Sequence, residues 1–262
     1  VILFGGLNKS DYQDCEGHDR QQYELPYAQN KLVTALAAAN KNFVYVNISG
    51  NAVAMPWKDK VPAIVQGWYL GSEAGEALAS VLTGDVNPSG KLPFTWVKSL
   101  QEVGAHVLNT YPGTWRLEGG AKTKGNIIDE EYKEGIYVGY RWADKEKQRP
   151  VFAFGHGLSY TQFAISKLRA DKTTMTATDS ITFTVQVKNI GQRAGSETVQ
   201  LYVHDVKASV DRPLKELKGF CKVSLQPGES KDVTITLGKD ALSFYDEATA
   251  AWKAEAGQFE AW

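Results

Sequence analysis

The segment Phe43-Val44-Tyr45-Val46-Asn47-Ile48 decides the fold class of the first half of the chain. A short, almost continuous apolar run of this kind is typical of a strand that is buried on both faces of a sheet. It follows a helical pattern at Pro26–Ala39, in which apolar residues recur at three- and four-residue spacings, and another apolar run at Val1–Phe4. The order strand, helix, strand predicts a parallel sheet covered by helices.

The same alternation continues after this segment. Val61–Trp68 reads as a third strand, Glu73–Leu82 as a second helix, and Lys91–Val97 as a fourth extended segment after the turn Asn87-Pro88-Ser89-Gly90. With only two helices, one face of a four-stranded parallel sheet would be left poorly covered. The first strand also begins at Val1 with no preceding turn or cap. We therefore expect an incomplete, mainly parallel α/β/α sandwich domain that belongs to a longer polypeptide.

Periodicity is lost between residues 99 and 149, where Gly, Tyr, Trp and charged residues are interspersed. A stretch this long without regular structure is usually functional or disordered. Its aromatic content argues against disorder. We expect an irregular loop over residues 99–149 that contributes to function.

The second half changes to a period of two. Ile181–Val187, Val199–Val203 and Val233–Leu237 alternate between apolar and polar residues, and turn signals separate them at Asn189-Ile190-Gly191 and Gln226-Pro227-Gly228. Short strands at this spacing predict an antiparallel β-sandwich. The fold class is therefore α/β followed by all-β, with an α/β domain at residues 1–160 and a β-sandwich at residues 161–262.

Composition excludes several function classes. The 262 residues carry a net charge of −1 from 29 basic and 30 acidic side chains, so nothing favours nucleic-acid binding. The apolar runs are shorter than the ~20 residues that span a bilayer, and we expect no membrane partner. An uncharged ligand fits this charge balance best.

Cofactor and metal signals are weak. Cys15 and Cys221 lie 206 positions apart, in what we expect to be different domains, so they predict neither a disulfide nor a redox compartment. Cys and His residues lack metal-ligand spacing, and Gly5-Gly6 lacks the rest of a dinucleotide fingerprint. We expect no metal and no cofactor.

The candidate functional segment is Cys15-Glu16-Gly17-His18-Asp19-Arg20. It follows the first strand, and functional loops of open α/β sheets lie at the carboxyl ends of the strands. Glu16 is the candidate for chemistry. The hexapeptide alone is equally compatible with a solvated surface loop that carries an Asp19–Arg20 ion pair.

Four motifs in order resemble the C-terminal region of glycoside hydrolase family 3 β-glucosidases and β-xylosidases. They are Cys15–Arg20, Ile48–Trp57, Gly84–Pro93 and Phe154–Tyr160. The resemblance covers essentially the whole chain. It implies an N-terminal (β/α)8 barrel, absent here, followed by an α/β sandwich domain and a C-terminal fibronectin type III-like antiparallel β-sandwich.

The resemblance also implies a mechanism. Retaining glycosidases use two carboxyl groups about 5–5.5 Å apart, one as nucleophile and one as acid/base. In the family the nucleophilic Asp comes from the barrel, whereas the glutamate of the Glu-Gly-x-Asp-Arg segment maps onto Glu16. Asp19 and Arg20 are expected to form a pair that holds the loop or to contact sugar. His18 is expected to be a loop residue or a contact in a distal subsite.

Trp115 and Trp142 are the aromatic candidates for stacking on sugar, because both lie in the irregular segment.

The resemblance predicts that this chain is the acid/base-bearing part of an exo-acting retaining β-glycosidase and is inactive without the barrel. A β-glucosidase is expected before a β-xylosidase. Its partners would be a β-linked oligosaccharide or an aryl or alkyl β-glycoside, and a barrel on the same or another chain. A homo-oligomer stays open, and a periplasmic or secreted location is favoured over a cytoplasmic one. The alternative is a non-catalytic module that binds carbohydrate or supports a partner.

Overall fold

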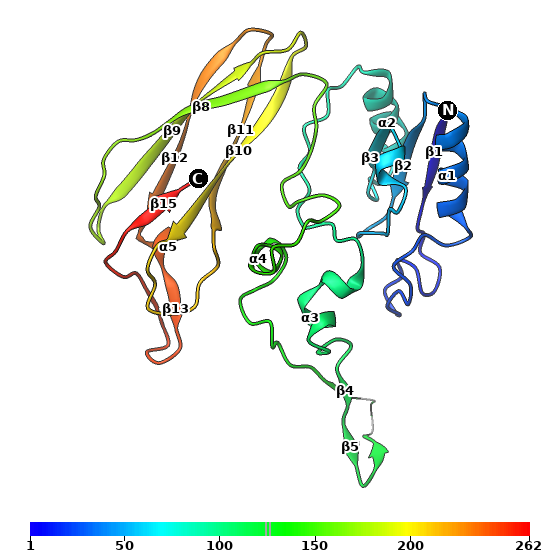
Figure 1. Ribbon diagram of the computed structural model, residues 1–262, viewed down its shortest axis with the longest axis horizontal. Coiled ribbons are helices and arrows are strands. Elements are labelled where there is room, and N and C mark those ends of the chain that lie inside the picture. The colour runs from blue at the N-terminus through cyan, green and yellow to red at the C-terminus, as the bar shows by residue number, and fades with distance from the viewer. Residues whose placement is uncertain (124, 126) are drawn as a thin grey trace. The chain divides into compact units, whose positions relative to one another are not determined.

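The computed structural model describes residues 1–123, 125 and 127–262, which form two compact units (Figure 1). The first, here the α/β unit, comprises Val1–Leu82, Phe94–Ala143 and Lys147–Phe154. The second, here the sandwich unit, comprises Thr83–Pro93, Asp144–Glu146 and Gly155–Trp262. The chain thus enters the sandwich unit in two short segments before residue 155. A boundary at residue 160 stays a prediction.

The α/β unit is built on a three-stranded parallel sheet in the order β1-β2-β3. The strands are β1 (Ile2–Gly6), β2 (Val44–Ile48) and β3 (Ala63–Gln66), and Val44 lies opposite Ile2 on one side and Ala63 on the other. Tyr45 and Val46 on the central strand are fully buried. The apolar segment from which the sheet was predicted therefore forms its middle strand.

The fourth strand expected at Lys91–Val97 is wrong. Within this segment Trp96 forms an isolated antiparallel bridge to Phe152, outside the sheet. The indole of Trp96 is buried and donates to the carbonyl of Val53 at 2.7 Å, so the segment is fixed through its side chain. Pro93 also lacks the N–H that a ladder would need.

Two main helices accompany the sheet, α1 (Gln29–Ala39) and α2 (Ala74–Thr83), with a short 3₁₀ turn η1 (Lys58–Lys60). The expected start of the first helix at Pro26 is three residues too early. Tyr27 and Ala28 both have φ of 57°, in the left-handed region, and a right-handed helix cannot begin until they have passed. The indole of Trp57 then donates to Asn30 at 2.8 Å and ties η1 to α1.

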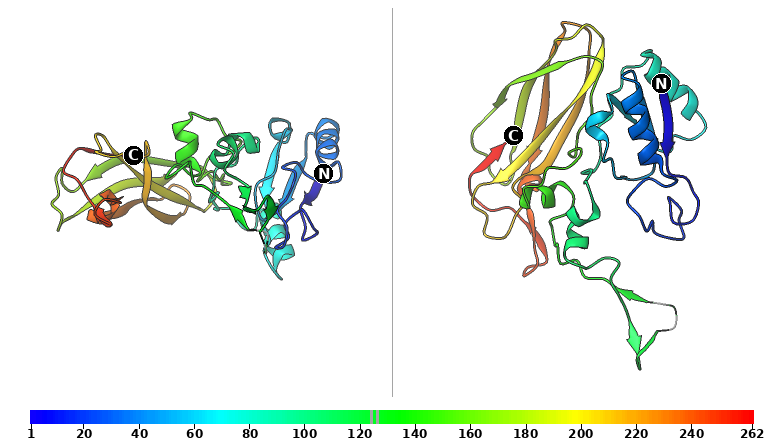
Figure 2. Two further views of the ribbon diagram at one scale, coloured as in Figure 1. Left: turned by 90° about the horizontal axis from the view of Figure 1, so that it is seen from below. Right: turned by 45° about the vertical axis from the view of Figure 1, so that its right-hand side comes forward.

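Residues 99–149 contain several very short elements rather than a structureless loop. Antiparallel pairing joins β4 to β7 and β5 to β6, which makes a narrow ribbon (Figure 2). Strands of two residues leave no periodicity in the sequence, which explains why the segment looked irregular. The elements are η2 (Leu100–Glu102), α3 (Gly104–Val107), β4 (Thr114–Trp115), β5 (Leu117–Glu118), β6 (Ala121–Lys122), β7 (Ile128–Asp129) and α4 (Tyr140–Lys145).

The sandwich unit has two three-stranded antiparallel sheets, ordered β12-β9-β8 and β11-β10-β15 (Figure 1), and a two-stranded antiparallel pair β13-β14. Val187 and Val233 from the first sheet form one buried cluster with Val199 and Leu225 from the second, as the period-two pattern predicted. The elements are β8 (Phe163–Ala170), β9 (Ser180–Asn189), β10 (Gly195–Asp205), β11 (Glu216–Leu225), β12 (Ser230–Gly238), α5 (Lys239–Leu242), β13 (Phe244–Asp246), β14 (Ala251–Lys253) and β15 (Phe259–Ala261).

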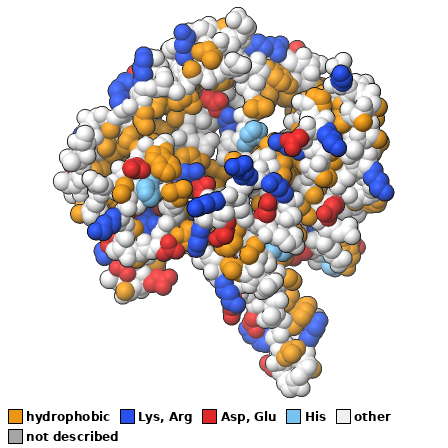
Figure 3. Space-filling model, viewed as in Figure 1, with side chains coloured by type: hydrophobic (Ala, Val, Ile, Leu, Met, Phe, Trp, Pro, Cys, Tyr) orange, Lys and Arg blue, Asp and Glu red, His pale blue; other side chains and the backbone are white. Residues whose placement is uncertain are grey.

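Acidic and basic side chains are interspersed over the face shown in Figure 3, in keeping with the net charge of −1. Among the described residues, no helix combines the length and the apolar character that crossing a membrane requires.

Candidate functional site

The loop of residues 7–28, here the Glu16 loop, connects β1 to α1. The side-chain amide of Gln29 joins its two ends, because it accepts from the N–H of Gly6 at 2.8 Å and donates to the carbonyl of Gly6 at 2.9 Å. Gly6 has φ of +133°, and a Cβ there would lie 2.0 Å from the carbonyl oxygen of Ile48. Only glycine lets the chain leave β1 so close to β2.

A buried polar network supports the surface on which the loop rests. The Asn47 amide donates to the Ser49 hydroxyl and to the Gln66 side chain, each at 2.7 Å. The Ser49 hydroxyl in turn donates to the carbonyl of Asn51 at 2.8 Å. Asn47 and Ser49 are fully buried, so these bonds fix the backbone that follows β2.

Asp14 attaches the loop to that backbone. Its carboxylate accepts from the N–H of Gly50 at 2.7 Å, the amide of Asn51 at 3.0 Å and the hydroxyl of Tyr69 at 2.9 Å. Burial and the hydrogen bond to Asp14 raise the pKa of Tyr69 to about 12. Asp14 is not among the candidate residues that the sequence motifs indicate. Its place in the polar segment was visible, but no spacing tells which of several acids will meet three donors.

Asp19 and Arg20 attach the other side of the loop, each to a different segment. The Asp19 carboxylate accepts from the hydroxyl of Tyr111, and this bond, with burial, raises the pKa of Tyr111 to about 12. The Arg20 guanidinium donates to the carbonyl of Ala52 at 2.5 Å, and burial lowers its pKa. In place of the expected Asp19–Arg20 pair, the two residues thus make two separate hydrogen bonds to different segments.

Glu16 lies between these attachments with its side chain exposed. The Cys15 thiol donates to the carbonyl of His18 at 3.2 Å, which closes a tight turn around Glu16 and Gly17. His18 is also exposed, and its ring lies 5.0 Å from that of Tyr12. An exposed carboxyl thus stands on a short turn whose two flanks are tied to the rest of the α/β unit.

A cavity of about 380 Å³ borders the loop at Asp19 and Arg20. Asn51, His106 and Tyr111 contribute further polar groups to its wall. Carboxylate, guanidinium, amide, imidazole and phenol groups in one cavity suit a ligand with many hydroxyl groups, since each hydroxyl both donates and accepts.

The two tryptophan candidates lie in different surroundings. Trp115 on β4 is exposed, and the Lys122 ammonium lies 3.7 Å from its ring centroid, over one face. Trp142 on α4 is buried at 8% exposure, and its ring lies 3.0 Å from where a Cβ on Gly104 would be. A buried ring cannot stack on sugar, so of the two roles expected for Trp142 only support of the segment fits.

The structure also brings together a group that spacing did not reveal. The ligand atoms of Asp11, Cys15 and His18 all lie within 4.8 Å of one another in the Glu16 loop. A cysteine and a histidine three positions apart gave no recognisable metal motif. The loop conformation, which brings Asp11 to them, is what completes the group.

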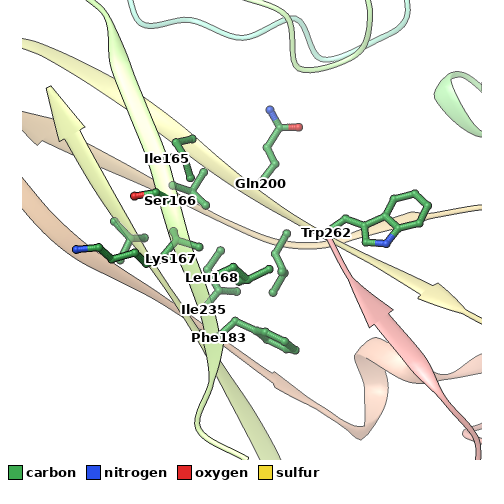
Figure 4. Close-up of a pocket in the computed structure, with 12 residues that line it drawn as sticks. Ile165, Ser166, Lys167, Leu168, Phe183, Gln200, Ile235 and Trp262 are labelled. Atoms are coloured by element: carbon green, nitrogen blue, oxygen red, sulfur yellow. The ribbon is translucent and has the colours of Figure 1, made fainter. Parts of the chain in front are cut away.

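A second cavity, of about 310 Å³, lies in the sandwich unit (Figure 4). Its walls are mostly apolar and come from both sheets, with Leu168, Phe183 and Ile235 among the lining side chains. It offers few groups that could orient a ligand and none that titrate near neutral pH. Its lining does not suit a sugar as well as the cavity beside the Glu16 loop does.

Both parts of the chain match known protein-family models. The model of the glycosyl hydrolase family 3 C-terminal domain matches residues 1–140. The chain belongs to glycoside hydrolase family 3. The model of the fibronectin type III-like domain matches residues 197–262, within the sandwich unit of this family 3 chain. The expected family and the expected fold class, α/β followed by a fibronectin type III-like sandwich, are confirmed.

Relatives within family 3 match along the whole chain. It is 51% identical to beta-glucosidase BoGH3A of Bacteroides ovatus over 264 residues, covering 100% of this chain and 34% of that protein. It is 44% identical to thermostable beta-glucosidase B of Acetivibrio thermocellus, covering 99% and 32% respectively. This family 3 chain therefore spans about a third of the length of the curated relatives it matches.

Solved structures agree with these matches. A crystal structure of a beta-glucosidase from Kluyveromyces marxianus in complex with glucose superposes with a TM-score of 0.83 at 42% identity, covering 99% of this chain and 29% of that one. DesR, a beta-glucosidase from Streptomyces venezuelae solved with D-glucose, gives a TM-score of 0.85 at 38% identity, covering 99% and 31%. Both parts of this family 3 chain thus have counterparts in known glycosidases.

Proposed function

We propose that this chain supplies the acid/base carboxyl group of an exo-acting retaining β-glycosidase, and that Glu16 is that group. A β-glucosidase is the first candidate and a β-xylosidase the second. The nucleophilic Asp would come from a (β/α)8 barrel on the same or another chain. The observation that carries the proposal is the exposed carboxyl of Glu16 on a turn held on one flank by Asp14 and on the other by Asp19 and Arg20.

Glu16 has two tasks in the proposed reaction. In the first step it donates a proton to the glycosidic oxygen while the barrel's Asp attacks the anomeric carbon, and the leaving alcohol departs. In the second step its carboxylate removes a proton from water, which then hydrolyses the glycosyl-enzyme. Both steps need an accessible carboxyl group, and Glu16 is exposed in this chain.

The attachments of the loop make Glu16 a positioned group. Proton transfer requires hydrogen-bond reach, and a displacement of about 1 Å can cost roughly 100-fold in rate. Asp14 holds the backbone two residues before Glu16, and Asp19 and Arg20 hold it three and four residues after. These three are positioning residues, and they fix the turn by contacts that do not involve the Glu16 side chain.

The substrate we propose is a terminal, non-reducing β-linked sugar on an oligosaccharide or on an aryl or alkyl aglycone. The names of the relatives support glucose, since those compared above are beta-glucosidases. The polar cavity beside Asp19 and the exposed side chains of His18 and Trp115 could contact such a ligand. Trp142 is buried, and we assign it to support of its segment rather than to sugar contact.

The decisive experiment uses a complete enzyme in which this chain replaces the matching third of the Bacteroides ovatus relative. Glu16→Ala should slow hydrolysis of alkyl glucosides, whose leaving groups need a proton, by about 10²–10⁴-fold. For activated aryl glucosides, the rate of the first step, cleavage of the glycosidic bond, should stay close to the wild-type rate. Azide, which needs no deprotonation, should restore turnover and yield β-glucosyl azide.

Glu73→Ala is the matched control, because Glu73 is also exposed and precedes α2 rather than lying in the Glu16 loop. It should leave all substrates and the azide response unchanged. Equal loss on good and poor leaving groups, with no azide effect, would exclude Glu16 as acid/base. A Glu16→Ala enzyme that hydrolyses alkyl glucosides at the wild-type rate would favour the alternative, in which this chain is a non-catalytic carbohydrate-binding module.

A further inference from the structure

Three potential metal ligands of different chemistry lie together in the Glu16 loop. Asp11 offers a carboxylate oxygen, Cys15 a sulfur and His18 an imidazole nitrogen, and these atoms lie within 4.8 Å of one another. We propose that Asp11, Cys15 and His18 bind one zinc-class divalent cation. This inference concerns binding alone and stands whether or not Glu16 is the acid/base.

The donor set selects the class of ion. Thiolate and imidazole favour zinc and its neighbours, whereas magnesium and calcium prefer oxygen ligands throughout. With metal–ligand distances of about 2.0–2.3 Å, neighbouring ligands of a tetrahedral zinc lie roughly 3.3–3.7 Å apart. Asp11 and His18 are exposed and Cys15 is half-buried, so rotation about side-chain bonds can close the remaining gap.

The proton balance is simple. In the free chain the Cys15 thiol donates to the carbonyl of His18 at 3.2 Å. Binding breaks that hydrogen bond, forms a sulfur–metal bond and releases the thiol proton to solvent. The imidazole binds in its neutral form and the Asp11 carboxylate as the anion. Water takes the fourth position, as in zinc sites with three protein ligands.

The fold favours such a site because all three ligands belong to one segment of eight residues whose backbone is already held. Asp14, between Asp11 and Cys15, is fixed by three hydrogen bonds to Gly50, Asn51 and Tyr69. Little further chain entropy is lost when a cation joins residues 11 and 18. The bound ion closes a ring around Glu16 and Gly17 and restricts their motion.

Cobalt is the probe, because a thiolate bound to Co²⁺ gives an absorption band in the near ultraviolet. The reduced 262-residue chain, its folding checked by circular dichroism, should develop this band to a single equivalent of Co²⁺. Zn²⁺ should remove the band by displacement, and Mg²⁺ should not. Cys15→Ser should abolish it, and His18→Gln and Asp11→Asn should each weaken affinity by at least about tenfold.

Cys221→Ser is the matched control, since Cys221 is the other free cysteine and lies on β11 in the sandwich unit. It should leave the band intact. A folded wild-type chain without the band, or a band lost in Cys221→Ser and kept in Cys15→Ser, would overturn the site. Hydrogen exchange of wild type covers the case of a misfolded variant: Zn²⁺ should slow exchange at Glu16 and Gly17, and unchanged exchange there would contradict the proposal.

Discussion

The carboxylate of Asp19 accepts a hydrogen bond from the hydroxyl of Tyr111, although the two residues lie 92 positions apart in the chain. The bond joins the Glu16 loop to the segment that looked irregular in the sequence. Both residues also line the cavity of about 380 Å³ beside the loop. The segment at residues 99–149 is therefore part of the support of the candidate site.

We expect Asp19→Asn and Tyr111→Phe to be coupled. Each alone removes the charge-assisted bond, so the double variant should lose less stability than the sum of the two single losses, by a coupling energy of about 0.5–1 kcal/mol for an exposed pair. Urea unfolding of the four proteins measures it. Tyr132→Phe, at an exposed tyrosine of the same segment, should show no coupling to Asp19→Asn. Strict additivity with Tyr111→Phe would contradict the contact.

Asp14→Ala should loosen the backbone that follows β2. The change leaves the N–H of Gly50 without its acceptor, and about 1 kcal/mol of lost local stability corresponds to roughly fivefold faster amide exchange at Gly50. Hydrogen exchange followed by NMR gives the rate directly. Asp59→Ala, at a side chain that is 90% exposed, should leave Gly50 exchange unchanged. Unaltered exchange in Asp14→Ala would mean that Asp14 does not hold the loop.

The 262-residue chain alone should not hydrolyse aryl β-glucosides. A retaining mechanism needs a second carboxyl group about 5–5.5 Å from the first, and loss of one of two cooperating groups costs several orders of magnitude in rate. Release of nitrophenol by the purified chain is the measurement, with the chimeric enzyme described above as the positive control. Turnover by the isolated chain at the chimera's rate would refute a nucleophile supplied from elsewhere.

The sandwich unit should show an acid-sensitive ion pair. The Arg169 guanidinium donates to Asp232 at 2.6 Å across β9 and lowers the pKa of that carboxyl below its usual value of 3.8. A lowered pKa contributes stability above the unfolded-state pKa, and that contribution is lost as pH falls through the folded-state pKa. Asp232→Asn should therefore lower the urea midpoint at pH 6, and its difference from wild type should shrink below about pH 4.

Glu247→Gln, at an exposed acid of the same unit, is the control for this pH dependence. The urea midpoint of Glu247→Gln should differ little from that of wild type at pH 6. If Asp232→Asn differed from wild type equally at pH 6 and pH 3, the Arg169 pair would not be the source of the effect.

The sequence predicted those parts of the fold whose side chains repeat with a clear period. Tyr45 and Val46 lie in a fully buried strand, and Val187 and Val233 in alternating ones, as their patterns indicated. The prediction from sequence failed where a contact of a single side chain determines the path of the backbone. The buried indole of Trp96, bonded to Val53, holds a segment whose composition resembles a strand.

In the candidate site, too, only some of the residues could be predicted from the sequence. Glu16 could be found because it sits in a short motif, whereas Asp14 gains its importance from Gly50, Asn51 and Tyr69, which come from later in the chain. The group formed by Asp11, Cys15 and His18 depends on the path of the loop rather than on spacing. Contacts that depend on tertiary structure leave no local pattern, so a motif can nominate a candidate group such as Glu16 but not the residues whose bonds hold its loop.

The amide of Gln29, bonded to both backbone groups of Gly6, closes the Glu16 loop at its base. Because the two ends of the loop are bonded to each other, a change in the loop need not move the strand and helix that it connects. Doubling the length of a flexible loop costs only about 0.6 kcal/mol in closure free energy. Exposed residues of this loop other than Asp14, Asp19 and Arg20 can thus be exchanged while the sheet and α1 keep their relation. This closure makes the exposed positions of the loop suitable for graft design.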